Sequence, residues 1–327
     1  LDIDSGGYIE RDQQGTANSF NYNYWSSSVG SISGNTASRG TGVASTNNTF
    51  SVKNQLFDGR NSAFPDSIKN FGTSPYYADS APSGVLKLSS YWLWKYNGTH
   101  DDYDAWIKID ETTSLLPGEG YTMKGSLGNV AIATQQNYVF KGKPNNGEII
   151  LTIAAGNDRL IGNPYPSALD ADEFILDNIK GTINSKEGRN TENIFNGALY
   201  FWHHFGKEDS HNLSEYVGGY ATYTLMGGTE AYSTDELINN STPLVGGGKV
   251  PERYIPPNQG FFVNATLDVA LDSTTTTVDG GNVVFKNSQR VFVREGFTGT
   301  NDGGTTACHV CRSQIIIDLL YKIKTDI

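Results

Sequence analysis

The chain has 327 residues, of which 37% are hydrophobic, 12% aromatic and only 18% charged. A net charge of −11 argues against a basic face for nucleic acid or for an anionic membrane surface, but it suits divalent cations and neutral polysaccharides. The 37 glycines and many aromatic residues are typical of an extracellular all-β protein, and no apolar run reaches the roughly 20 residues of a membrane-spanning helix.

Short runs rich in aromatic and β-branched residues, bounded by Gly, Pro or Asn, predict strands along most of the chain. In chain order they are YWLWKYN (91–97), GYTMKG (120–125), NYVFKG (137–142), EIILTIA (148–154), GFFVNA (260–265) and NVVFKN (282–287). Pro-Gly at 117–118 and Pro-Asn at 257–258 predict tight turns that deliver the next strand. Helical periodicity is sparse, and its best candidate is ALDADEFILDNI (168–179), with Asp170 or Asp172 as the N-cap.

Four short sequence segments each occur twice, in the same order, which predicts an internal duplication. The matched pairs are Asn23 and Ser27 with Asn163 and Ser167, YWLWKYNG (91–98) with LYFWHHFG (199–206), LPGEGYTM (116–123) with PPNQGFFV (256–263), and NYVFK (137–141) with NVVFK (282–286). The predicted fold is therefore all-β, with two tandem β-sandwich or jelly-roll-like modules at 16–153 and 157–292. Residues 1–15 would end a preceding strand-rich segment, and 293–327 would form an atypical tail.

Long polar inserts interrupt both predicted modules. They lie at 30–51 and 54–84 in the first and at 226–254 in the second. We expect these inserts to be loops on a rigid scaffold, where recognition residues are commonly placed.

Several phrases resemble a region of large secreted proteins of Bacteroidota. They are ERDQQGTANSFNYNYWSSSVG (10–30), LLPGEGYTMKG (115–125), RLIGNPYPSALDADEF (159–174) and IPPNQGFFV (255–263). In those proteins the region lies just before a C-terminal sorting domain that the type IX secretion system recognises. The resemblance covers about residues 8–300 and implies an extracellular or cell-surface location, with the secretion machinery as a partner through a sorting domain outside this sequence. Many such proteins are adhesins or handle polysaccharides, often with calcium-binding modules elsewhere.

The resemblance stops near the end of the chain. Where more strands and a sorting domain would follow, the sequence has ACHVCRSQIIIDLLYKIKTDI (307–327), and a vector-derived tail, a frame change or a native variant would each explain it. Cys308 and Cys311 are the only cysteines, so the body of the protein has no disulfide framework. Their C-x-x-C spacing lacks the second ligand pair of a structural zinc site.

Two stretches carry enough carboxylates to supply calcium ligands. They are Asp101, Asp102 and Asp104 in THDDYDAW (99–106), and Asp170, Asp172 and Glu173 in ALDADEF (168–174). Calcium takes six to eight oxygen ligands, but neither stretch matches the twelve-residue EF-hand loop. Solvated turns and helix caps are the alternative, and NDGG (301–304) is a further short candidate. His203 and His204 are adjacent on a predicted strand, so they should point to opposite faces and not share a metal.

Exposed aromatic residues are the candidate ligand contacts. Tyr76, Tyr77, Tyr103 and Trp106 lie in irregular stretches, where an aromatic side chain is less readily explained by a core. Trp92 and Trp94 are two residues apart and would share one face of a strand, which favours core packing instead.

The sequence contains none of the familiar catalytic motifs, which favours binding over catalysis. The first functional expectation is a non-catalytic module at the cell surface, active in adhesion or as a structural stalk. The second is a module that binds a polysaccharide or cell-surface glycan, and the third is a polysaccharide hydrolase or lyase, which needs two carboxylates at a spacing that a sequence does not show.

Overall fold

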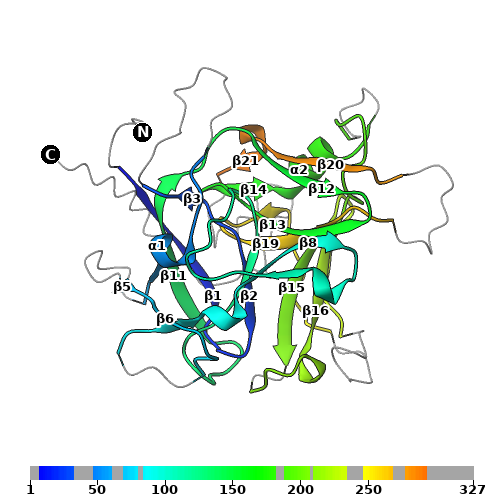
Figure 1. Cartoon of the computed structure of the whole chain (residues 1–327). Coiled ribbons are helices and arrows are strands. Elements are labelled where there is room, and N and C mark those ends of the chain that lie inside the picture. Colours follow the sequence, from blue (N-terminus) through cyan, green and yellow to red (C-terminus); the bar gives the residue numbers. More distant parts are fainter. Residues whose placement is uncertain are drawn as a thin grey trace, which may run out of the picture.

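The computed structural model describes residues 7–32, 47–60, 69–79, 84–181, 188–206, 209–233, 246–267 and 277–292. Within these ranges the regular structure is mostly β-strand, in largely antiparallel sheets with two short α-helices (Figure 1). The predicted all-β class is therefore confirmed. Neither of these α-helices is long and apolar enough to cross a bilayer.

A five-stranded sheet is formed by strands of the first half of the chain, up to residue 144; the second half begins with β12 at residue 149. Its strand order is β1 (Ile9–Thr16), β11 (Gln135–Pro144), β4 (Leu56–Asp58) and β5 (Lys69–Asn70), with β3 (Val29–Gly30) paired to β11. The short helix α1 (Val52–Gln55) leads directly into β4. β1 pairs with β11 along its whole length, so residues 9–16 belong structurally to this half, although they lie mostly before the predicted module boundary at 16.

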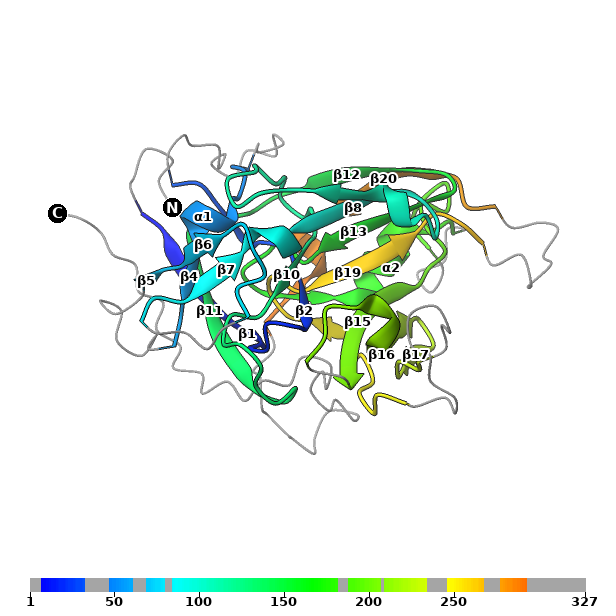
Figure 2. The same cartoon turned by 60° about the horizontal axis from the view of Figure 1, so that its bottom comes forward.

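A nine-stranded sheet, as described, joins the two halves (Figure 2). Its order is β17 (Gly227–Thr229), β16 (Val217–Thr224), β15 (Leu199–Gly206), β19 (Gly260–Asn264), β13 (Asn157–Gly162), β8 (Trp94–Thr99), β10 (Tyr121–Lys124) and β2 (Tyr22–Trp25), with β9 (Trp106–Lys108) paired to β8. The joint is the antiparallel pairing of β8 with β13, in which residues 97–99 face residues 157–159. A small cluster of Tyr96, Leu160 and Phe262 packs there.

The second half is completed by two further sheets and a helix. β12 (Ile149–Ala154) pairs with β20 (Gly280–Phe285), and β14 (Ala168–Asp170) lies between β18 (Tyr254–Ile255) and β21 (Arg290–Val291). The predicted helix is confirmed as α2 (Ala171–Asn178), because the Asp170 carboxylate accepts hydrogen bonds from the backbone N–H groups of Asp172 and Glu173.

Each half has its own hydrophobic core. The aromatic members of the first core are Trp25, Phe50, Tyr121, Tyr138 and Phe140. Those of the second are Tyr165, Phe174, Phe195, Phe201, Tyr223, Phe261 and Phe285. The alternation of IILTIA explains how β12 joins the second core, since Ile149, Leu151 and Ile153 point inward while the residues between them are exposed. β12 spans the predicted boundary at 153, and the module boundaries stay a prediction.

One predicted strand begins later than the sequence indicated. Residues 90–92 form the 3₁₀ turn η2 (Ser90–Trp92), and β8 starts only at Trp94. Trp92 and Trp94 therefore do not share a strand face. The remaining short elements are β6 (Gly72–Ser74), which pairs in parallel with β7 (Lys87–Ser89), and the 3₁₀ turns η3 (Tyr103–Ala105), η4 (Leu213–Glu215) and η6 (Asn287–Gln289).

Candidate functional site

Three of the four predicted aromatic contacts are exposed. Tyr76 is 78% exposed, Tyr103 71% and Tyr77 47%. Trp106 is only partly exposed, because its ring packs edge-on against Tyr96 and Phe262 where the two halves join. Tyr76 and Tyr77 are thus the adjacent pair most available to a ligand.

The segment that carries Tyr76 and Tyr77 is held by β7 and η2. Ser89 Oγ donates a hydrogen bond of 2.6 Å to the carbonyl of Tyr76, and Ser90 Oγ donates one of 3.2 Å to that of Ser74. Ala78 follows with a φ of 57°, in the left-handed region that costs an L-residue about 1 kcal/mol or more. Such strained residues are frequent at binding sites, where the surrounding structure must impose them.

Tyr77 belongs to a group of aromatic rings that also includes Tyr91 and Trp92. The Tyr77 ring stacks on Trp92 at 5.3 Å between centroids and 23°, and it meets Tyr91 edge-on at 5.1 Å. Tyr91 is exposed as well. We call Tyr76, Tyr77, Tyr91 and Trp92 the tyrosine cluster. Its members come from two segments that the pairing of β6 with β7 brings together.

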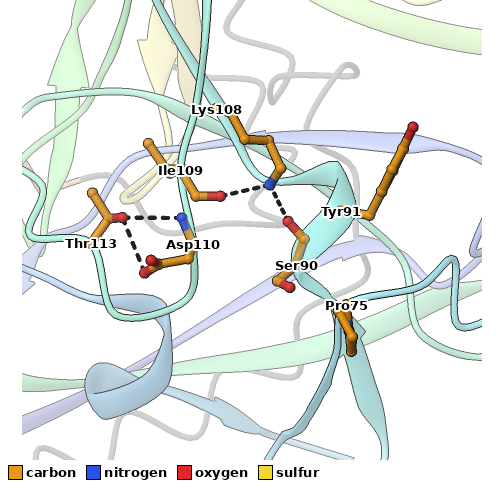
Figure 3. A pocket seen from close by; sticks show the side chains of 7 residues that line it. All are labelled: Pro75, Ser90, Tyr91, Lys108, Ile109, Asp110 and Thr113. Atoms are coloured by element: carbon orange, nitrogen blue, oxygen red, sulfur yellow. Dashed lines mark hydrogen bonds between the residues drawn. The ribbon is translucent and has the colours of Figure 1, made fainter.

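A pocket of about 370 Å³ adjoins the tyrosine cluster (Figure 3). It is lined by Pro75, Ser90, Tyr91, Lys108, Ile109, Asp110 and Thr113. Pro75 and Tyr91 supply apolar walls, and Asp110 and Thr113 supply polar groups. The pocket is shallow and open to solvent, and its lining combines apolar walls with a few polar groups, as ligand sites commonly do.

The polar groups of the pocket are arranged by local hydrogen bonds. Lys108 Nζ donates to the carbonyl oxygens of Ser90 and Ile109 (Figure 3). It also donates to the carbonyl oxygen of Leu93, so its charge is held by backbone groups. Asp110 Oδ1 accepts hydrogen bonds from Thr112 and Thr113, which lower the pKa of this carboxyl. The carboxylate is therefore ionised at neutral pH and can accept hydrogen bonds from a ligand.

A buried lysine lies directly beneath the tyrosine cluster. Lys124 is only 2% exposed, and its Nζ lies 3.6 Å from the centroid of the Trp92 ring and 4.6 Å from that of Tyr22. Nζ also contacts His211 Nδ1 at 2.7 Å and Tyr216 Oη at 2.5 Å. Burial lowers the pKa of Lys124 to about 7.

His211 connects this lysine to the tyrosine cluster. Its Nε2 lies 2.9 Å from Asp79 Oδ1, and its ring stacks on Trp92 at 4.6 Å and lies 4.9 Å from that of Tyr77. Sequence reasoning missed Lys124, because a lysine that ends a strand is ordinarily solvated. It missed the role of Asp79 because the partner of Asp79, His211, is 132 residues away in the sequence.

The first carboxylate stretch is divided between a cap and a small polar group. Asp102 accepts a hydrogen bond from the N–H of Asp104 and caps η3. Asp101 joins two residues that were not among the candidates: His100 Nε2 lies 3.4 Å from Asp101 Oδ2, and His100 Nδ1 lies 2.9 Å from Asp158 Oδ2. These three could hold a metal ion, although exposed acidic groups also gather without one.

The carboxylates of the second stretch pair with arginines. Arg253 donates to both oxygens of Asp170, at 2.9 and 2.8 Å, and lies 3.3 Å from Asp172. Glu173 pairs with Arg189 at 2.7 Å. This arrangement accounts for all three carboxylates without a metal, so calcium there stays an untested prediction. The candidates at 301–304 and at Cys308 and Cys311 lie outside the described residues.

Comparison with protein families finds one match, and it covers about three quarters of the chain. The model of a family described as a domain of unknown function, DUF8693, matches residues 73–319. The chain belongs to this family. No curated protein and no solved structure matches the chain.

The DUF8693 match contains nearly the whole candidate site. It begins at residue 73, within β6, and so includes the tyrosine cluster, the pocket, Lys124 and His211. β1 and β2 lie before the matched range, although β1 pairs with β11 and β2 pairs with β10 inside it. The description of the DUF8693 family states no activity, so the function has to be argued from the site.

Proposed function

We propose that this protein is a non-catalytic module that binds a neutral polysaccharide at the tyrosine cluster and the adjoining pocket. The observation that carries the proposal is the exposure of Tyr76, Tyr77 and Tyr91 beside a pocket with an ionised carboxylate. Flat aromatic faces pack against the apolar C–H face of a sugar ring, while carboxylate and hydroxyl groups orient its hydroxyls.

Charge and chemistry both favour a neutral ligand and binding without turnover. The net charge of −11 would repel an acidic glycan. Of the residues that line the described pocket, Asp110 alone is a carboxylate, whereas a glycoside hydrolase of the common kind needs two across the scissile bond. The resemblance to secreted proteins of Bacteroidota supports a location outside the cell, where such a ligand would be met.

Isothermal titration calorimetry with neutral hexasaccharides of glucose, xylose and mannose would test this proposal. At least one should bind, and Tyr76→Ala should weaken binding by roughly 2- to 10-fold, the effect of losing about 0.5–1.5 kcal/mol of ring contact. Tyr232→Ala is the matched control, because Tyr232 is an exposed tyrosine of the second half with its hydroxyl on Glu230. No binding of any hexasaccharide at millimolar concentration would refute the proposal.

A structural stalk at the cell surface is the second candidate, and the shared sheet favours it. β8 and β13 tie the halves together through antiparallel pairing, so pulling on the chain would load backbone hydrogen bonds rather than a linker. Force spectroscopy on the chain should then show one rupture at high force. Two separate low-force events, one for each half, would contradict this role.

A further inference from the structure

Lys124 is held where the two halves meet. It ends β10 in the first half, whereas His211 and Tyr216 come from the connection between β15 and β16 in the second. Tyr216 Oη donates onward to the carbonyl of Phe20 at 2.9 Å, and the His211 ring stacks on the Phe20 ring at 4.5 Å. The segment between β15 and β16 is thus attached to the first half through the buried Lys124 and the residues around it.

The hydrogen bonds of this group determine the tautomer of neutral His211. When Lys124 is charged, its ammonium has no acceptor, so His211 Nδ1 accepts the bond from Lys124 Nζ. Nε2 then carries the proton and donates it toward Asp79 Oδ1 at 2.9 Å. Neutral His211 is therefore satisfied on both sides of its ring.

Protonation of His211 would break this arrangement. It would place an N–H on Nδ1, and two donors and two positive charges would then face each other across the 2.7 Å between Nδ1 and Lys124 Nζ. Asp79 at the other nitrogen opposes this effect only in part, because its side chain is partly solvated. Among the described residues, the phenols of Tyr22, Tyr77 and Tyr216 also face the pair, and they stay neutral in acid. His204 is one residue further out, with its ring 4.7 Å from that of Tyr216, so the His211→Gln variant is needed to separate its titration from that of His211.

We propose that His211 is a pH sensor whose protonation in acid releases the tyrosine cluster and weakens saccharide binding there. The cluster responds because Tyr77 and Trp92 both contact the His211 ring, and Asp79 is two residues from Tyr77. The saccharide part of this inference rests on the proposed function, whereas the release of the cluster does not.

The direction of the pH dependence follows from the two bases. Burial and the charge of Lys124 lower the pKa of His211, while Asp79 raises it less, and burial lowers the pKa of Lys124 to about 7. The unfolded chain therefore binds more protons than the folded one, and stability rises with pH. The contribution of neutral His211 is present above the ordinary histidine pKa near 6.5 and is lost as the pH falls through its lowered value. Asp110 stays ionised over this range because hydrogen bonds lower its pKa.

The first experiment needs no ligand. Tryptophan fluorescence and histidine ring NMR signals of the whole chain would be followed from about pH 8 to about pH 5, the range in which histidine titrates. The Trp92 environment should change with the titration of His211, at a pKa below the usual one. His211→Gln should remove the change that follows the histidine and leave only the change from the titration of Lys124 near pH 7, and Lys124→Met should raise the pKa of His211. His100→Gln is the matched control, because His100 Nδ1 also lies at hydrogen-bonding distance from a carboxylate, that of Asp158, but the partners of His100 are Asp101 and Asp158.

The second experiment measures the affinity for the hexasaccharide that binds at neutral pH. We expect a loss of roughly tenfold in acid for the wild type, and no loss for His211→Gln. A fluorescence change that depends on His211 without saccharide binding would refute the proposed function but leave the sensor. Binding that is equally strong at both pH values, or an acid loss that survives in His211→Gln, would refute the sensor.

Discussion

At the scale of single residues, two adjacent histidines lie in different environments although one peptide step separates them. His203 and His204 lie on β15 and point to opposite faces, as the sequence predicted. His203 is 7% exposed, and burial lowers its pKa to about 4, with Lys249 adding to the effect. His204 lies on the other face, where its ring is 4.7 Å from that of Tyr216.

Replacing His203 should therefore flatten the acid side of the stability curve. The unfolded chain takes up a proton near the ordinary pKa of 6.5, but the folded chain does so only near pH 4, so wild-type stability falls as the pH drops through this interval. The loss should be on the order of 2–3 kcal/mol, and His203→Gln should lack it. Urea unfolding at several pH values would measure both slopes. If stability falls with pH equally steeply in both proteins, the pKa of His203 is the same in the folded and the unfolded chain, and burial does not lower it.

The candidate site was only partly predictable at this scale. Tyr76, Tyr77 and Tyr103 were expected to be exposed because they lie in irregular stretches, and they are. Lys124 and Asp79 could not be expected, because the environment of each depends on residues of the β15–β16 connection. The exposure of a side chain in a loop is a local property, whereas the burial of a strand-end lysine is not.

At the scale of elements, two turns of the same kind deliver β10 and β19. Gly118 follows Pro117 with a φ of 81°, and Asn258 follows Pro257 with a φ of 66°. The backbone N–H of Glu119 donates to the carbonyl of Leu116 at 2.9 Å. In the second turn the N–H of Gln259 donates to the carbonyl of Pro256 at 3.3 Å. This is the type II pattern, which needs Gly or Asn at its third position, so the turns expected from Pro-Gly and Pro-Asn are confirmed.

Comparing two glycine substitutions separates backbone strain from packing. Gly118→Ala adds a methyl group that would lie 3.2 Å from Phe285 and 3.3 Å from Leu151, both in the second core. Gly156→Ala imposes a similar φ of 80° but meets no atom within 4 Å. We expect Gly156→Ala to cost about 1 kcal/mol of stability and Gly118→Ala about 1–2 kcal/mol more. Equal shifts of the thermal midpoint would show that the core yields to the methyl group at no cost.

The one clear error at this scale also has a physical cause. YWLWKYN has the composition of a strand, yet its first residues form η2. A 3₁₀ turn there lets Trp92 contact Tyr77 and His211, and it places Ser90 Oγ within hydrogen-bonding distance of Ser74. Tertiary contacts thus overrode a local propensity that spans only about 1 kcal/mol.

At the scale of the whole molecule, corresponding strands of the two halves follow one order. β15, β19 and β13 occupy successive places in the large sheet, and β8, β10 and β2 repeat that order in the first half. β1 with β11 and β12 with β20 are likewise antiparallel pairs, one in each half. These strands include the sequence segments that match between the two halves. The duplication itself stays a prediction, because a common strand order alone does not establish it.

The shared sheet should make the two cores unfold together. Phe140→Leu would weaken the first core and Phe174→Leu the second, each by roughly 1–3 kcal/mol. Because β8 and β13 and the cluster around Leu160 connect the halves, we expect both variants to lower the midpoint of one common transition in calorimetry. Two transitions, each shifted by only one variant, would show that the halves unfold independently.

The sequence by itself determined the all-β class, most strands, the capped helix and the two tight turns at Pro-Gly and Pro-Asn. These features depend on residues within a few positions of one another, such as the alternation of IILTIA or the Asp170 cap. Only the tertiary structure decided that β8 pairs with β13, that Tyr77 lies on Trp92, and that Lys124 meets His211. The partners in these contacts lie between 15 and 87 residues apart, and folding alone brings them together.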